Sequence, residues 1–141
     1  MFNPSRDEAR RFLVESWRKR REGLPLSGLE TLAASIVAVH PEYHAILEAP
    51  EAHVDRDWRP ETGDVNPFLH LSLHLAVAEQ LSIDQPPGIR AEYDRIRIAR
   101  GGDHPALHAV LECLGEVLWT AQRHGKPPDA ALYLACLARQ K

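Results

Sequence analysis

The chain has 141 residues and little cysteine: Cys113 and Cys136 are its only two, and they lie far apart in the sequence. No Cys-x-x-Cys pair is present, which excludes the common cysteine-based zinc and redox motifs. Both cysteines lie in segments rich in apolar residues. We therefore expect free thiols that pack as small hydrophobic side chains in a reducing compartment.

Long apolar runs and strong net charge are also missing. No segment approaches the ~20 apolar residues that a membrane helix needs, and the segment Met1 to Glu8 lacks the regions of a signal peptide. The formal net charge is only −3, so charge attracts neither nucleic acid nor an anionic membrane. These absences predict a cytoplasmic protein with no nucleic-acid partner and no membrane partner.

Strand-like alternation is not found, whereas helix signals recur along the chain. Ser27 and Glu30 form a capping box, and Asn66-Pro67 is a typical helix start. The predicted class is all-α: a helical bundle with short additional helices and one long loop over 50–65, in a single domain over residues 1–141. The helices that carry the argument below cover about 68–83, 89–100 and 104–124, and a last helix starts at Pro127-Pro128-Asp129 and runs to about residue 139.

Histidine is what the chain has in an unusual pattern. Six of its eight histidines form pairs four residues apart: His40 with His44, His70 with His74, and His104 with His108. Random placement of eight histidines would give about 0.4 such pairs. On a helix, residues four apart lie on the same face, one turn from each other. Two imidazoles so placed can bind one metal ion or reach toward two neighbouring ions.

Helical wheels predict that these pairs face inward. His70 and His74 lie in the middle of an apolar face, whereas Glu79 lies opposite to them. His104 and His108 lie among leucines, and Glu112 lies at the edge of the same face. On that helix Cys113 lies about 180° from His104, which argues against a thiolate ligand.

The first pair depends on Pro41, which follows His40 directly. Proline inside a helix removes a hydrogen bond, so the helix either kinks or restarts there. A kinked helix would place His40 and His44 on one apolar face. A restart would make His40 the cap and Pro41 the first helical residue.

Burying six imidazoles is costly unless each ring nitrogen finds a partner, and these apolar faces offer few hydrogen-bonding groups. A metal site would give these nitrogens a partner together. Six histidines are too many for one structural zinc ion. We therefore predict two transition-metal ions, with iron favoured and zinc or manganese as alternatives. The predicted ligands are His40, His44, His70, His74, His104, His108 and Glu112. Weaker candidates for supporting or proton-transfer roles are Tyr43, Glu48, Tyr93 and Glu116.

This ligand set is analogous to that of haemerythrin-like di-iron bundles and of type-3 copper bundles, although haemerythrins use more carboxylate and another helix order. The chain resembles a bacterial family of conserved proteins that is known only as a domain of unknown function. The resemblance covers essentially the whole chain and is carried by Met1-Phe-Asn-Pro-Ser-Arg6, His40-Pro-Glu-Tyr-His44, the segments 66–74 and 80–89, and the segment from His108 to Trp119. It implies no activity.

Two functions remain open on the sequence. The first is a dinuclear metalloprotein, either an oxidoreductase or a hydrolase, that acts on a small molecule or dioxygen. The second is an interaction module without metal, in which the histidines form a buried, pH-sensitive hydrogen-bond network. A homodimer is compatible with both, because Trp17, Trp58 and Trp119 can serve a core or an interface.

Overall fold

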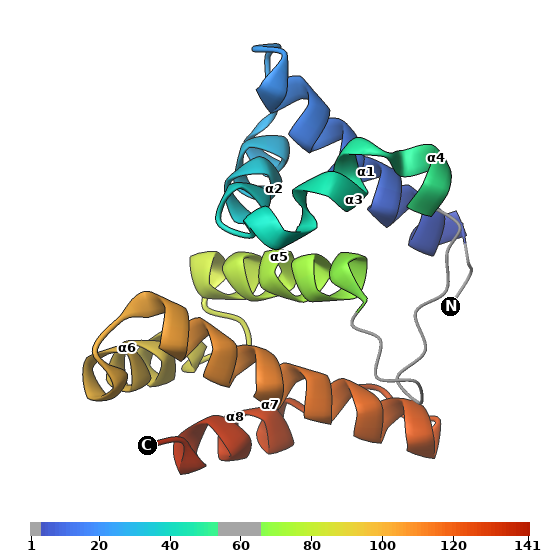
Figure 1. Ribbon diagram of the computed structural model, residues 1–141. Helices are drawn as coiled ribbons and strands as arrows, with labels where there is room; N and C mark the ends of the chain where they lie inside the picture. Colours follow the sequence, from blue (N-terminus) through green and yellow to red (C-terminus); the bar gives the residue numbers. More distant parts are fainter. Residues whose placement is uncertain (1–3, 54–65) are drawn as a thin grey trace. The chain divides into compact units, whose positions relative to one another are not determined.

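The computed structural model describes residues 4–53 and 66–141, and within these ranges every regular element is a helix (Figure 1). The all-α prediction is thus confirmed. Part of the predicted loop is the short helix α4, and residues 54–65 lie outside the described residues. The elements are α1 (Pro4–Arg21), α2 (Gly28–Ala38), the 3₁₀ helix η1 (Pro41–Tyr43), α3 (His44–Glu48), α4 (Pro50–His53), α5 (Pro67–Ile83), α6 (Ile89–Arg100), α7 (Asp103–His124) and α8 (Ala130–Arg139).

The chain divides into two compact units, Met1–Leu75 and Ala76–Lys141, and each is described by itself. In the first unit α2 packs against α1 and η1, and α3 packs against α1. In the second unit α6, α7 and α8 pack against one another. The expectation of one domain over residues 1–141 stays a prediction.

The segment between α2 and α3 shows how the sequence resolves the break at Pro41. The predicted capping box opens α2: Glu30 N donates to Ser27 Oγ at 3.2 Å, and Ser27 N donates to Glu30 Oε1 at 2.9 Å. The helix ends at Ala38, and His40 is the N-cap of η1, with Pro41 as its first residue. The chain therefore restarts at Pro41 rather than kinking, as proline at a first helical position favours.

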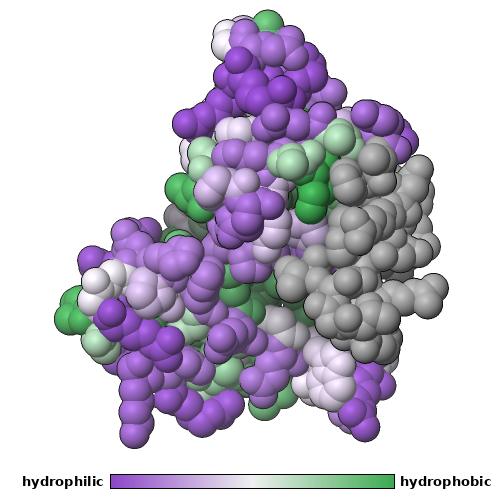
Figure 2. Space-filling view, viewed as in Figure 1, coloured by the Kyte–Doolittle hydropathy of each residue, from purple (hydrophilic) through white to green (hydrophobic). Residues whose placement is uncertain are grey.

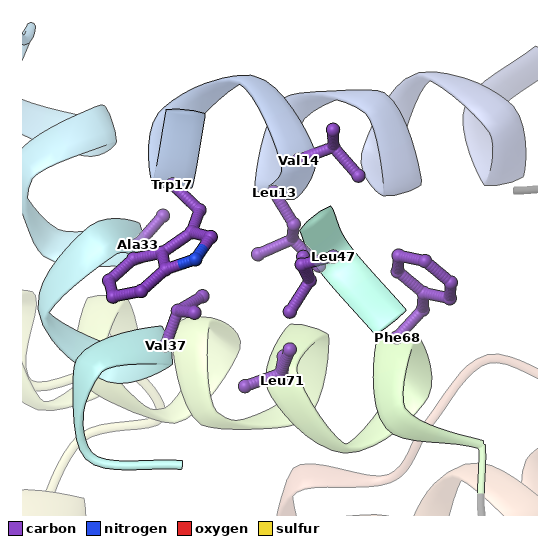
Figure 3. Close-up of a cluster of buried hydrophobic side chains, with 8 residues drawn as sticks. All are labelled: Leu13, Val14, Trp17, Ala33, Val37, Leu47, Phe68 and Leu71. Carbon is purple, nitrogen blue, oxygen red and sulfur yellow. The ribbon is translucent and has the colours of Figure 1, made fainter. Parts of the chain in front are cut away.

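A continuous apolar core holds the first unit together (Figure 3). Leu13 and Trp17 from α1, Val37 from α2, Leu47 from α3 and Leu71 from α5 converge on it. Leu47, Val37 and Leu71 are fully buried. This packing fixes α2 and the first half of α5 against each other, and these are the elements that carry the histidines discussed below.

The second unit is built on α7. Its buried residues include Ala109, Cys113 and Val117, and the helix packs against α6 and α8. Helix α8 begins after Asp129, whose carboxylate accepts from the amides of Ala131 at 2.8 Å and Leu132 at 3.3 Å. This is the usual way in which an aspartate satisfies the unpaired amides of a helix start.

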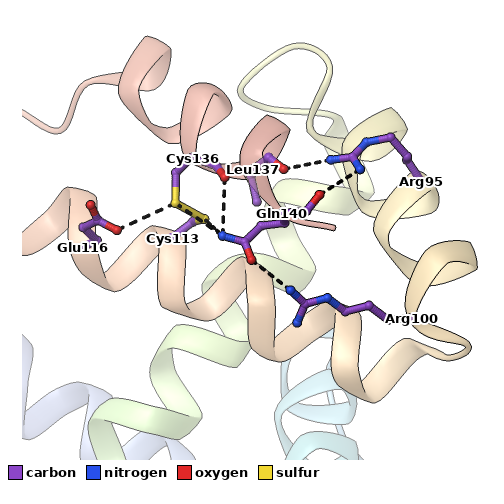
Figure 4. The surroundings of a disulfide bond; sticks show 7 residues. All are labelled: Arg95, Arg100, Cys113, Glu116, Cys136, Leu137 and Gln140. Atoms are coloured by element: carbon purple, nitrogen blue, oxygen red, sulfur yellow. Dashed lines mark hydrogen bonds between the residues drawn. A yellow bond between two sulfur atoms is a disulfide. The ribbon is translucent and has the colours of Figure 1, made fainter.

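The prediction that both cysteines are free thiols is wrong, because a disulfide joins Cys113 of α7 to Cys136 of α8 (Figure 4). The two helices pack side by side, which brings the two Cα atoms to 5.7 Å although 23 residues separate them in the sequence. Disulfides are typical of oxidising compartments. The cysteines therefore no longer support the expectation of a cytoplasmic protein.

Two arginines of α6 fasten the last turn of α8 (Figure 4). The Arg95 guanidinium donates to the carbonyl of Leu137 at 2.9 Å and to that of Gln140 at 2.9 Å. Arg100 donates to the side-chain oxygen of Gln140 at 3.0 Å. Carbonyls that have no partner at a helix end are thereby satisfied by charged donors.

The surface is mostly hydrophilic in the view of Figure 2. At the basic end of α1, Arg18 pairs with Glu15 and Glu22, and Lys19 pairs with Glu30. Among the described residues, no helix is long and apolar enough to span a membrane.

Leu71→Ala should lower the free energy of unfolding by about 2–5 kcal/mol, because it leaves a cavity in a fully buried position. Leu69→Ala on the same helix is the control, since Leu69 is 56% exposed; it should change stability by less than about 0.5 kcal/mol. Urea unfolding followed by circular dichroism measures both. Equal losses in the two variants would contradict the packing of α5.

Reduction of the disulfide should destabilise the second unit by about 3 kcal/mol, because it frees a closed loop in the unfolded chain. Thiol titration of the denatured, unreduced protein should find no free cysteine. The Cys113→Ser/Cys136→Ser variant should unfold like the reduced protein and should not respond to reductant. Two titratable thiols in freshly isolated, untreated protein would overturn the assignment.

Candidate metal centre

Three histidines of the first unit form a compact cluster. His40 follows the end of α2, and His70 and His74 lie one turn apart on α5. One ring nitrogen of each lies within 4.8 Å of the corresponding nitrogens of the other two. The ring centroids of His40 lie 5.1 Å from His70 and 4.6 Å from His74. The structure thus joins the second predicted pair to one member of the first.

His40 is held in one orientation and one tautomer. Its Nδ1 lies 2.7 Å from the carbonyl oxygen of Ile36, which can only accept, so Nδ1 carries the proton. In the neutral ring Nε2 is then a bare acceptor. This atom is buried and has no hydrogen-bond partner among the described residues. Metal-binding histidines commonly donate their other nitrogen to a backbone carbonyl in this way.

His70 and His74 share a hydrogen bond between their Nε2 atoms, which are 3.2 Å apart. One ring must donate and the other accept. Two nitrogens that bind one ion tetrahedrally, each about 2.05 Å from it, lie about 3.3 Å apart. The observed separation therefore fits two ligands of a single ion, which would take the place of the shared proton.

His44 is directed elsewhere by the restart at Pro41. Its Nε2 donates to the carbonyl of Val37 at 2.8 Å, and its ring lies against Trp17 with centroids 4.4 Å apart. Trp17 in turn donates its indole N–H to Glu48 at 3.0 Å. The structure therefore gives His44 and Glu48 other partners and does not bring them into the three-histidine cluster.

Tyr43, which the sequence indicates as a candidate for a supporting role, lies beside the cluster. Its ring is nearly parallel to that of His40, with centroids 5.8 Å apart, and lies 5.9 Å from the ring of His70. Burial and, to a lesser extent, the Glu42 carboxylate raise the pKa of Tyr43. The phenol therefore keeps its proton at neutral pH and can donate a hydrogen bond next to the cluster.

The remaining predicted ligands lie in the second unit, on α7. His104 and Glu112 are exposed, His108 is half-buried, and the rings of the two histidines are 4.2 Å apart. The wheel misjudged this helix: Ala109, Cys113 and Val117, which pack into the unit, lie about 140–220° from His104. The inward orientation predicted for His104 and Glu112 is wrong, whereas the ligand role of all three stays a prediction.

The weaker candidates of the second unit have structural partners. The Tyr93 hydroxyl donates to Asp103 at 2.9 Å; burial first, then this bond, raise the pKa of Tyr93 to about 12. Glu116 is exposed, with a carboxylate oxygen 3.8 Å from the sulfur of Cys136. Neither contact indicates a role in a metal site.

Comparison with known proteins identifies the family of this chain. The model of a domain of unknown function, DUF1841, matches residues 5–139. The chain belongs to this family. The resemblance seen in the sequence is therefore confirmed over nearly the whole chain, and DUF1841 membership assigns no activity. No curated protein and no solved structure matches the chain. The chemistry must accordingly be argued from the residues of the site.

The hydrogen-bond pattern predicts opposite tautomers for neighbouring histidines. In the neutral, metal-free protein, His40 should carry its proton on Nδ1 and His44 on Nε2, because each donates to a backbone carbonyl. Long-range ¹H–¹⁵N correlation spectra of the imidazoles distinguish the two forms. The same tautomer on both rings, or rapid exchange at His40, would contradict this geometry.

Proposed function

We propose that the protein binds a transition-metal ion through His40, His70 and His74. The observation that carries the proposal is the buried Nε2 of His40, whose lone pair faces no hydrogen-bond donor among the described residues. The bond from Nδ1 to Ile36 leaves that lone pair available in the neutral ring. One ring nitrogen each of His40, His70 and His74 lies within 4.8 Å of the other two.

The donor set narrows the choice of ion. Imidazole nitrogens suit iron and zinc, whereas manganese prefers oxygen ligands. The three-histidine cluster contains no carboxylate among the described residues, which disfavours manganese further. We propose iron first and zinc second. The predicted second ion needs His104, His108 and Glu112 as ligands, and we retain it as a separate proposal that stoichiometry tests.

Three protein ligands leave coordination positions for an exogenous molecule, as in catalytic rather than structural metal sites. An ion held in this way can activate water or dioxygen. The protein's own contribution would be to orient His40 through Ile36 and to place the protonated phenol of Tyr43 beside the ligands. A metal-dependent oxidation or hydrolysis of a small molecule is the reaction class that we propose.

A metal-free histidine network is the second candidate, and the hydrogen bond between His70 and His74 favours it. In that case the cluster stabilises the first unit by itself, and neither metal nor chelator should change the melting temperature. If a metal is bound, its addition raises the melting temperature according to its concentration and affinity. The two candidates therefore differ in a direct measurement.

Untagged protein should retain, or take up under anaerobic conditions, about one equivalent of iron or zinc in the three-histidine cluster. His40→Ala, His70→Ala and His74→Ala should each weaken metal affinity by at least about a hundredfold, because loss of a ligand costs more than loss of its supporting partner. Elemental analysis and competition with a chromophoric chelator measure stoichiometry and affinity.

His124→Ala is the matched control, since this histidine is exposed and lies in the second unit; it should bind metal like the unmodified protein. His44→Ala should also keep the ion, because His44 contacts Trp17 and Val37 instead. A second equivalent that is lost in His108→Ala would support the dinuclear proposal. Less than half an equivalent of metal in the unmodified protein, or equal metal affinity in all variants, would contradict the proposal of metal binding.

A further inference from the structure

We propose that the second unit binds a small amphipathic carboxylate, such as a medium-chain fatty acid, in a pocket between the end of α7 and the start of α8. This proposal does not rest on the metal site, because every residue that lines the pocket belongs to the second unit. The pocket has a volume of about 410 Å³. Sites for small molecules commonly have volumes of about 300–1,000 Å³. In Figure 1 the two helices are orange and red.

One part of the pocket is apolar. Val117 and Ala121 of α7 are buried, and Leu132 of α8 is 52% exposed although it is a large aliphatic side chain. A neighbouring pocket of about 200 Å³ is lined by Val117 as well and extends the apolar surface past Leu118. An alkyl chain placed against Leu132 would remove apolar area from water, which is the main source of affinity for such a ligand.

The other part of the pocket is charged, and its charges are not equivalent. The carboxylate of Asp129 already accepts two amide hydrogen bonds at the start of α8. Lys126 lines the pocket and forms no ion pair with any described residue. His124 and the hydroxyl of Thr120 add further hydrogen-bonding groups. Both bonds use Oδ1, so Asp129 stays an anion held by the helix start, and among the residues that line the pocket Lys126 is the one lysine or arginine.

The backbone fixes the position of Lys126 beside the pocket. Gly125 ends α7 with a φ of 63°, a left-handed conformation that favours glycine. The amide of Lys126 then donates to the carbonyl of Ala121 at 2.9 Å, which ties the lysine to a residue of the apolar wall. One lysine beside an aliphatic wall suits a monocarboxylate with an alkyl chain, because the lysine acts as a point charge and the wall offers apolar contact.

Octanoate is a suitable probe, and its titration should be followed by amide shifts in ¹H–¹⁵N spectra. Saturable shifts are expected at Val117, Lys126 and Leu132. Lys126→Ala should raise the dissociation constant of octanoate about two- to fivefold, because loss of an exposed ion pair weakens binding by about that factor. Leu132→Ala should also weaken binding, through lost apolar contact. Both residues are exposed, so neither variant should alter folding.

Lys141→Ala is the matched control, because it removes an exposed lysine of the same unit that does not line the pocket; it should bind octanoate like the unmodified protein. Octan-1-ol and octylamine should bind more weakly than octanoate. The proposal is overturned if Lys126→Ala and Lys141→Ala behave alike, if octan-1-ol binds as well as octanoate, or if the shifts do not saturate or map elsewhere.

Discussion

The hydrogen bond from His40 Nδ1 to the carbonyl of Ile36 is the interaction on which the proposed site depends. It exists because α2 ends at Ala38 and the chain restarts at Pro41, which leaves His40 between two helices. The apolar core around Val37 and Leu71 then holds this junction against α5. The same contacts thus fix the backbone, the ring orientation and the tautomer of His40. As a result, its Nε2 carries no proton.

Burying that nitrogen carries a cost. A buried polar atom without a partner destabilises a fold by about 1–3 kcal/mol, and His40 is only 3% exposed. Groups of this kind in native proteins call for an explanation, of which an ion or a catalytic role is a common one. Coordination by a metal would offset the cost at His40 and would replace the proton between His70 and His74. The same bonds that orient the ligands would then make the ion a contributor to the stability of the first unit.

The sequence predicts the helices well where local signals decide them. The capping box at Ser27 and the boundaries of α6 follow from side chains within a few residues, whereas Pro41 left a kink and a restart open. It is harder to predict which face of a helix packs against its neighbours. The wheel for α7 placed His104 inward, because it reports the apolar residues of one helix and not which face meets α6 and α8. The disulfide between Cys113 and Cys136 was missed for the same reason, since the packing of α7 on α8 determines it. His44 was assigned with His40 on the assumption of a continuous helix, and the restart gives it Trp17 as its neighbour instead.

The central claim is that one metal ion binds to Nε2 of His40 together with His70 and His74. Anomalous diffraction from crystals of untagged protein grown with iron or zinc tests it most directly. The account predicts an anomalous peak about 2.0–2.1 Å from the His40 Nε2 atom and from one ring nitrogen each of His70 and His74, with His40 Nδ1 still bonded to Ile36. A peak bound through Nδ1 of His40, a peak located away from these three rings, or no peak in metal-saturated crystals would contradict it.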